Sequence, residues 1–278
     1  MKTIVVTGGS SGVGAETVKR LQTQGHQIYN LDIQPPASSP SFATFVACDL
    51  SQQSSIDQAI GQLPHHIHSI ANVAGIADAK SPPKVVAVNF FGLRHLTEAL
   101  IDRMPEGGHI VNVSSIAGRD WRTKFDAIQR VLGTSSMAEG LALLEQEPKI
   151  MGRSAYTLSK RLVTAYSQHL VKEVRAKGIT VNNVSPGPVA TPLYPQFESL
   201  LGSEQSDWMI QQAGRQATPE DIAIVIEMLC LTDSQWLNGV DLPVDGGFSA
   251  GVESGWIDFH KSPAMIAMKQ SAQPSAPH

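Results

Sequence analysis

Tyr156 and Lys160 are the two side chains of this sequence whose types and spacing best suit proton transfer. They lie four positions apart in Ser154-Ala-Tyr-Thr-Leu-Ser-Lys160, so a helix would place both on one face. A phenol ordinarily has a pKa of about 10, which is too high for acid–base work at neutral pH, and a nearby ammonium lowers that pKa. Alone the pattern is weak, because many helices contain it by chance.

A glycine-rich turn near the N-terminus could bind the phosphates of a dinucleotide. It follows the apolar run Thr3–Thr7 and reads Thr7-Gly-Gly-Ser-Ser-Gly-Val-Gly14, a spacing that differs from Gly-x-Gly-x-x-Gly. Glycines there permit a tight turn, a close approach of backbone to pyrophosphate and close packing of the next helix, whose free N–H groups attract phosphate. We predict cofactor contacts from Gly8, Ser10, Ser11, Gly12, Val13 and Gly14.

Asp32 decides which dinucleotide we expect. It ends the second apolar run, where a carboxylate can bind the adenosine ribose hydroxyls and repels a 2′-phosphate. No Arg or Lys occurs among Gly8–Gly14 or directly after Asp32, where Ile33 follows. We therefore predict NAD rather than NADP, with Asp32 and Ile33 at the adenosine end.

The elements that must position these residues alternate between short apolar runs and helical patterns. About seven strands separated by helices predict an α/β fold with one doubly wound parallel sheet and helices on both faces. Residues 1–260 would form this single domain, and Val85–Met104 would form one long helix. The predicted strands are Thr3–Thr7, His26–Ile33, Phe42–Cys48, Ile67–Val73, His109–Ser114, Ile179–Val184 and Val240–Val244.

Composition narrows the class of protein. The chain has 278 residues, 42% of them hydrophobic and 17% charged, with a formal net charge of −4, which argues against nucleic acid or an anionic membrane as partner. No apolar stretch approaches the ~20 residues of a membrane span, so we expect a cytoplasmic protein. Cys48 and Cys230 are expected to be buried thiols, and we expect no metal, even at the histidine-rich stretch Pro64–His68.

Together, the spaced motifs resemble those of the short-chain dehydrogenases/reductases over residues 1–247. The resemblance implies a Rossmann fold and an NAD-dependent enzyme that interconverts a secondary alcohol and a ketone, acting on a CH–OH group. The motifs that carry it are Thr7–Gly14, Asp32, Asp49-Leu50, Asn72-Val-Ala-Gly75, Asn89, Ser114-Ser115, Tyr156 with Lys160, Pro186-Gly187 and Asp245-Gly-Gly247.

The resemblance also implies roles for residues along the cofactor. Val73 stands where the family usually has the second Asn of Asn-Asn-Ala-Gly, a small departure. Asn89 would hold a proton-relay water through its backbone. Asp49 and Leu50 would contact the adenine, and the remaining cofactor contacts would come from Val73, Ala74, Gly75, Pro186, Gly187, Val189 and Thr191.

The same resemblance assigns the proton-transfer group. Tyr156 would take a proton from the alcohol, and Lys160 would hold the nicotinamide ribose and lower the Tyr156 pKa. The catalytic serine of the family aligns with Ser115, which would hydrogen-bond the substrate oxygen, and Ser114 is the alternative.

Ser115 and Tyr156 lie 41 positions apart, whereas the family usually has about a dozen. Residues 119–153 therefore resemble the insertion of a bacterial subgroup, the 3α-hydroxysteroid dehydrogenase/carbonyl reductases. We expect a homo-oligomer, dimer or tetramer, whose interface the insertion reshapes; a cap over the active site or surface decoration are the alternatives. Beyond the family motifs, Trp256, Ile257 and Phe259 could cover the substrate cleft or a neighbouring subunit, and 261–278 would be a tail with a loose end.

Three hypotheses for the function follow. The first is an NAD-dependent alcohol dehydrogenase acting on a hydroxysteroid or another bulky cyclic or aromatic alcohol. The second is a general carbonyl reductase working toward the alcohol. The third is a regulatory protein that binds the dinucleotide without turnover, which the presence of Tyr156, Lys160, Asn89 and Ser115 disfavours.

Overall fold

Seven parallel strands form one sheet, in the order β3-β2-β1-β4-β5-β6-β7. The computed structural model describes residues 1–37, 43–152 and 154–271. The predicted fold class is confirmed, and each predicted strand is present with ends shifted by a few residues, Phe42 lying outside the described residues. The strands are β1 (Thr3–Thr7), β2 (Gln27–Asp32), β3 (Thr44–Ala47), β4 (Ser69–Asn72), β5 (His109–Val113), β6 (Thr180–Pro186) and β7 (Asp241–Val244).

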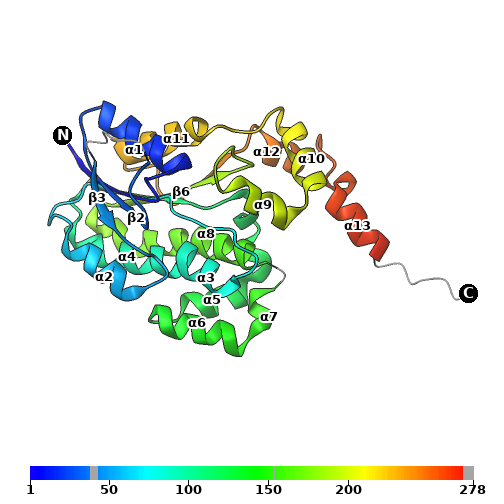
Figure 1. Cartoon of the computed structure of the whole chain (residues 1–278), viewed down its shortest axis with the longest axis horizontal. Coiled ribbons are helices and arrows are strands. Elements are labelled where there is room, and N and C mark those ends of the chain that lie inside the picture. Colours follow the sequence, from blue (N-terminus) through cyan, green and yellow to red (C-terminus); the bar gives the residue numbers. More distant parts are fainter. Residues whose placement is uncertain (38–42, 153, 272–278) are drawn as a thin grey trace, which may run out of the picture.

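Helices cover both faces of the sheet (Figure 1). On one face lie α1 (Gly12–Thr23) and α11 (Pro219–Leu231), whose apolar residues at helical spacing pack in a core with β1. On the other face lie α2 (Gln53–Gly61), α4 (Leu93–Leu100) and α8 (Ala155–Val174). The chain thus forms three layers, as a buried parallel sheet requires.

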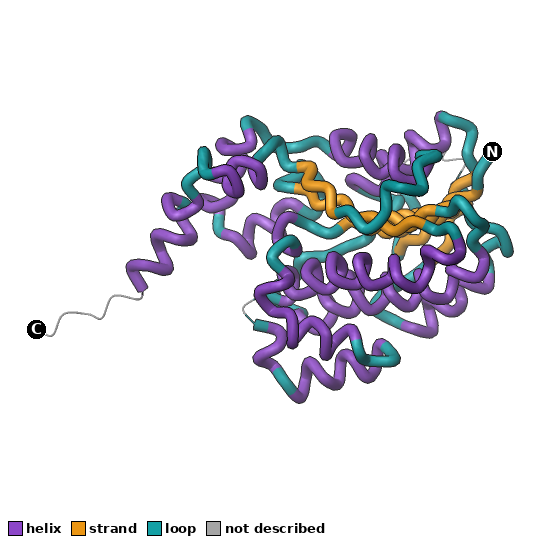
Figure 2. Tube along the Cα trace, turned by 180° about the vertical axis from the view of Figure 1, so that it is seen from behind, coloured by secondary structure: helices purple, strands orange, loops and turns teal. Residues whose placement is uncertain are grey.

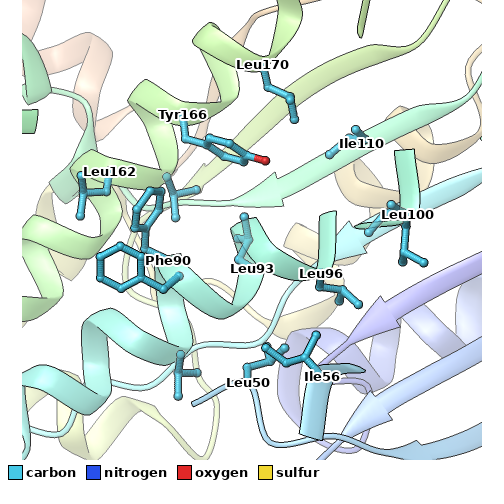
Figure 3. Packing of buried hydrophobic residues seen from close by; sticks show 14 of the residues in the cluster. Leu50, Ile56, Phe90, Leu93, Leu96, Leu100, Ile110, Leu162, Tyr166 and Leu170 are labelled. Carbon is cyan, nitrogen blue, oxygen red and sulfur yellow. The ribbon is translucent and has the colours of Figure 1, made fainter. Parts of the chain in front are cut away.

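The larger core fills the space between the sheet and α2, α4 and α8 (Figure 3). Leu96 and Leu100 of α4 point toward Ile56 of α2, and all three are fully buried. The ring of Phe90 meets the edge of Tyr166 with ring centres 5.9 Å apart. These contacts fix α8, the helix that carries Tyr156 and Lys160, against the sheet.

The strand order reverses between β1 and β4, which run side by side. Connections leave the carboxyl ends of these two strands in opposite directions, so a crevice opens there. Thr7 ends β1, and its Oγ1 accepts hydrogen bonds from the N–H groups of Val73 at 3.0 Å and Ala74 at 3.1 Å. The glycine turn and the loop after β4 are thereby held together at the crevice.

The predicted helix Val85–Met104 is not continuous. It is built from α3 (Pro82–Val86), the π-helical turn η1 (Ala87–Gly92), α4, and the short 3-10 turn η2 (Ile101–Arg103). A π turn widens the helix by one residue and is common at functional sites. Periodicity alone missed it because every residue of η1 is buried, so no change of face marks the turn, and a single glycine such as Gly92 is tolerated within a helix.

Residues 119–152 of the insertion form a helical layer outside α8. After η3 (Ile116–Gly118) and η4 (Trp121–Lys124) come α5 (Phe125–Leu132), α6 (Met137–Gln146) and α7 (Pro148–Met151). Ile128, Val131 and Leu144 join the larger core, so the insertion packs against the body of the fold. Gly140 lies so close to Phe91 that a Cβ there would come within 2.1 Å of the ring.

Two helices follow β6, namely α9 (Tyr194–Leu201) and α10 (Ser203–Ala213). After β7 come α12 (Phe248–Ser254), η6 (Phe259–Lys261) and α13 (Pro263–Ser271). Helix α13 leaves the body of the molecule beside α10 and α12 (Figures 1 and 2). The expected tail, 261–278, contains helix α13, and residues 272–278 lie outside the described residues. Within the described chain, no helix has the length and apolarity to cross a bilayer.

Candidate active site

A cleft of about 550 Å³ opens at the carboxyl ends of the strands and contains both the glycine turn and Tyr156. Its walls come from the ends of β1, β2, β4, β5 and β6 and from α8 and α9. This is the place where open α/β sheets bind ligands. None of the described residues of the insertion, 119–152, lines the cleft.

The glycine turn leaves no room for side chains. Gly8 has φ +72°, and a Cβ there would lie 2.8 Å from the Cα of Ala74. A Cβ on Gly14 would lie 2.0 Å from the carbonyl oxygen of Gly8. Helix α1 starts at Gly12, so its first N–H groups face the cleft. These features fit a dinucleotide pyrophosphate held on backbone N–H groups.

The carboxylate of Asp32 ends β2 at the adenosine end of the cleft, beside Ile33, Asp49 and Leu50. Its Oδ2 accepts a hydrogen bond from the N–H of Ser10 at 3.0 Å, which fixes the carboxylate against the glycine turn. Among the described residues that line the cleft, the cationic side chains are Lys84 and Lys160. Neither belongs to the turn or follows Asp32, where a 2′-phosphate would need a partner.

Tyr156, Lys160 and Ser115 meet inside the cleft. Nζ of Lys160 lies 5.7 Å from the centre of the Tyr156 ring and donates a hydrogen bond to the carbonyl of Val113 at 2.9 Å. Burial lowers the pKa of Lys160 to about 8. Burial raises the pKa of Tyr156 to about 12, and the hydrogen bond of its hydroxyl with Ser115 acts in the opposite direction.

The two neighbouring serines at the end of β5 have different surroundings. Oγ of Ser114 donates to the carbonyl of Lys160 at 3.0 Å and forms a hydrogen bond of 2.7 Å with Oγ1 of Thr164, in which either hydroxyl can be the donor, so Ser114 joins β5 to α8. Ser115 accepts a bond from the N–H of Ala117 at 3.2 Å and faces the phenol of Tyr156. The geometry therefore favours Ser115 over Ser114 as the group that meets a substrate oxygen.

Asn89 lies behind the cleft rather than in its wall. Its Oδ1 accepts from the N–H of Ile76 at 2.8 Å, and its Nδ2 donates to the carbonyl of Ile76 at 2.9 Å and to Ser159 Oγ at 3.0 Å. The side chain thereby ties η1 to the loop after β4 and to α8. A Cβ on Gly75 would lie 3.5 Å from both Asn89 Oδ1 and Lys160 Nζ, so the loop runs directly over this group.

Most of the predicted site residues line this one cleft. Ser10 and Asn89 do not, and each supports a residue that does. The predicted residues in the lining are Gly8, Ser11, Gly12, Val13, Gly14, Asp32, Ile33, Asp49, Leu50, Val73, Ala74, Gly75, Ser115, Tyr156, Lys160, Pro186, Gly187, Val189 and Thr191.

The wall formed by α9 was missed by the sequence analysis. Phe197 meets Tyr156 edge to face with ring centres 5.4 Å apart. Tyr194 and Gln196 also line the cleft, and Gln196 Oε1 accepts from the N–H of Ala77 at 3.4 Å across the opening. The sequence signal for this wall is the aromatic and apolar run Leu193–Phe197 after β6. The run does not reveal which of its rings faces Tyr156.

A doubly wound sheet with a glycine turn at its switch point defines a nucleotide-binding α/β protein of the Rossmann type. The family model described as "short chain dehydrogenase" matches residues 2–127, and the one described as "Enoyl-(Acyl carrier protein) reductase" matches residues 125–249. The chain belongs to the short-chain dehydrogenase/reductase family, whose members are oxidoreductases that use a nicotinamide cofactor.

Three relatives are similar over nearly the whole chain. Coniferyl-alcohol dehydrogenase from Pseudomonas sp. (strain HR199 / DSM 7063) is 37% identical over 250 residues, 90% of this chain and 97% of that protein. The 3-alpha-hydroxysteroid dehydrogenase/carbonyl reductase of Comamonas testosteroni is 27% identical, with 90% and 97% covered. The crystal structure of 3-alpha-hydroxysteroid dehydrogenase from Pseudomonas sp. B-0831 complexed with NADH is 26% identical, with a TM-score of 0.76 and coverage of 91% and 98%. The resemblance to the hydroxysteroid dehydrogenase/carbonyl reductases is thus confirmed.

Proposed function

We propose that the protein is an NAD-dependent alcohol dehydrogenase in which Tyr156 transfers the proton. The observation that carries this proposal is the position of the Tyr156 hydroxyl, which is bonded to Ser115 inside the cleft with Lys160 beside its ring. Short-chain oxidoreductases that act on alcohols are the relatives of this chain. The site thus pairs a general acid–base group with the cofactor fold that the chemistry needs.

In the oxidation of an alcohol, Ser115 orients the substrate hydroxyl by a hydrogen bond and Tyr156 takes its proton. A bound nicotinamide ring supplies the hydride acceptor. The ammonium of Lys160 favours the phenolate of Tyr156 electrostatically, against the burial that raises the Tyr156 pKa to about 12. Lys160 Nζ, with its one hydrogen bond to Val113, has further N–H groups for the ribose hydroxyls of the cofactor. In reverse, Tyr156 returns the proton to a carbonyl oxygen.

The preference for NAD rests on Asp32. Its carboxylate is held by Ser10 at the adenosine end, where it would accept hydrogen bonds from ribose hydroxyls and repel a 2′-phosphate. The relative complexed with NADH is consistent with this choice.

For the substrate we propose a bulky aromatic or cyclic alcohol, with an aromatic alcohol preferred. Phe197 presents a ring to Tyr156, and Leu193, Tyr194 and Pro188 add apolar surface to the same wall. Flat apolar substrates gain most from such a wall. The relatives named for coniferyl alcohol and for 3-alpha-hydroxysteroids support both members of this class.

The test is a set of initial rates followed by absorbance of the reduced nicotinamide. Coniferyl alcohol, a 3α-hydroxysteroid and cyclohexanol would each be offered with NAD and with NADP. We expect turnover with NAD and the highest kcat/KM for the aromatic alcohol, and loss of turnover in Tyr156→Phe. Wild-type rates in Tyr156→Phe would overturn the proton-transfer assignment, and a preference for NADP would overturn that of Asp32.

We also propose that the protein works as a homo-oligomer and that the insertion bears on its subunit contact. The insertion helices α5 and α6 cover the outer side of α8 and η1, so a neighbouring subunit would meet the insertion instead of α8 there. Light scattering of a variant with charges on the exposed side of α5, such as Phe125→Glu, tests this proposal, because an unchanged subunit number would contradict it.

A further inference from the structure

The helices α9, α10 and α13 are joined in series by buried polar contacts. At the cleft end, Tyr194 OH of α9 and Ser206 Oγ of α10 share a hydrogen bond of 2.8 Å, and Ser206 is fully buried. At the far end, Gln205 Oε1 of α10 accepts a bond of 2.9 Å from the N–H of Ala264 in the first turn of α13. Gln205 is 5% exposed. The adjacent residues Gln205 and Ser206 of α10 therefore bind its two neighbours, α13 and α9.

Aromatic packing reinforces the same connection. The ring of Trp208 in α10 meets Phe248 of α12 edge-on with centres 5.8 Å apart and Phe259 of η6 with centres 5.9 Å apart. Ile257 is 2% exposed in the same cluster. The segment after the family motifs thus folds back onto α10, the outer support of the cleft wall, rather than into the cleft.

We propose that Gln205 is a positioning residue through which α13 holds α10 and α9 in place, and with them Phe197 against Tyr156. The inference rests on the proposed function, because Tyr156 is its reference point. None of the side chains of α9 is fully buried, so its position depends on such contacts. If the bond from Ala264 is removed, the buried side-chain oxygen of Gln205 lacks its hydrogen-bond partner. Helix α10, and with it α9, is then held less firmly.

Two variants remove the same bond from opposite sides. Gln205→Leu removes the acceptor, and Ala264→Pro removes the N–H donor. Ala264 is exposed at the second position of α13, and the chain already begins α3 with the pair Pro82-Pro83, so a second proline after Pro263 is compatible with a helix start. Gln211→Leu, the same substitution at an exposed position of α10, is the control.

We expect the KM for the alcohol to rise about tenfold in Gln205→Leu and in Ala264→Pro, the size of one buried hydrogen bond. The KM for NAD should change by less than about twofold, because α10 and α13 lie away from the glycine turn. The double variant should match the single ones, since both remove one bond. Alcohol KM values equal to that of Gln211→Leu, or effects that multiply in the double variant, would overturn the proposal.

A second measurement needs no turnover. Hydrogen exchange followed by mass spectrometry should show faster exchange of the amides of residues 194–201 in Ala264→Pro and Gln205→Leu than in Gln211→Leu. Unchanged exchange would overturn the positioning role even if KM moved. This readout stays valid if Tyr156→Phe kept its rate, an outcome that would overturn the proposed function instead. Should Gln205→Leu fail to fold, Ala264→Pro decides alone.

Discussion

Replacing Ser114 and Ser115 by alanine in turn should separate folding from catalysis at neighbouring positions. Both hydroxyls lie at the carboxyl end of β5, and the residues are 2% and 3% exposed. The deleted atom is the same in both variants, so differences in outcome come from what each hydroxyl touches.

Ser114→Ala removes the bonds to the Lys160 carbonyl and to Thr164. At about 1 kcal/mol for each neutral hydrogen bond, the free energy of unfolding should fall by about 2 kcal/mol. The rate should stay close to that of the wild type, since this hydroxyl faces α8. Ser115→Ala loses the bond from the N–H of Ala117 and the bond with the Tyr156 hydroxyl. Ser115 and Tyr156 both line the cleft, where water can take the place of the lost hydroxyl, so this variant should cost less than about 1 kcal/mol.

Catalysis should show the opposite order. Ser115→Ala removes the donor that would meet the substrate oxygen, and loss of one such donor lowers kcat by about 10²- to 10³-fold. Urea unfolding followed by circular dichroism gives the stabilities, and absorbance of the reduced nicotinamide gives the rates. If Ser114→Ala lost as much kcat as Ser115→Ala at unchanged stability, the assignment of Ser115 would be refuted.

Four further outcomes follow from the structure. Asp32→Ala should shift the ratio of kcat/KM for NAD over NADP toward NADP by about tenfold or more, because the carboxylate no longer repels a 2′-phosphate; an unchanged ratio contradicts its role. Burial lowers the pKa of Lys160 from 10.5 to about 8, so between these pH values the unfolded chain binds more protons than the folded protein. The free energy of unfolding of the wild type, measured with urea at each pH, should therefore rise from pH 8 to 10 relative to that of Lys160→Met. Parallel curves for the two proteins would contradict this. Gly140→Ala should lower the melting temperature, since its Cβ would meet Phe91 at 2.1 Å and such overpacking costs about 1–3 kcal/mol. Thr218→Ala should cost about 1 kcal/mol in urea unfolding by removing the capping box with Asp221, and an unchanged midpoint would speak against that cap.

The parts of the site that depend on local backbone could be predicted from the sequence. The glycines of the turn at Gly8 and Gly14 are dictated by contacts within a few residues or with the neighbouring strand. The face shared by Tyr156 and Lys160 follows from helical periodicity. In the same way, the capping residues of α11 give its start.

The parts of the site that depend on tertiary contacts could not be predicted from the sequence. Ser114 and Ser115 directly follow β5 and both line the cleft. Only the positions of α8 and Tyr156 tell which hydroxyl bonds to the helix and which one faces the phenol. The π turn around Asn89 is set by bonds to Ile76 and Ser159, far along the chain. The contact of Phe197 with Tyr156 depends on where α9 lies, which its short sequence does not determine.

The two walls of the cleft differ in how firmly the rest of the protein holds them. Buried hydrogen bonds hold the wall that carries Tyr156. Ser114, Thr164 and the Lys160 carbonyl join β5 to α8. A second buried set of hydrogen bonds, between Asn112, Ser167 and Asn183, joins β5 and α8 to β6. The opposite wall, α9, buries no side chain completely. Substitutions in that wall, apart from Phe197, whose ring contacts Tyr156, can therefore accumulate without disturbing the geometry of proton transfer. Such a separation allows the substrate range to diverge during evolution while the chemistry is retained.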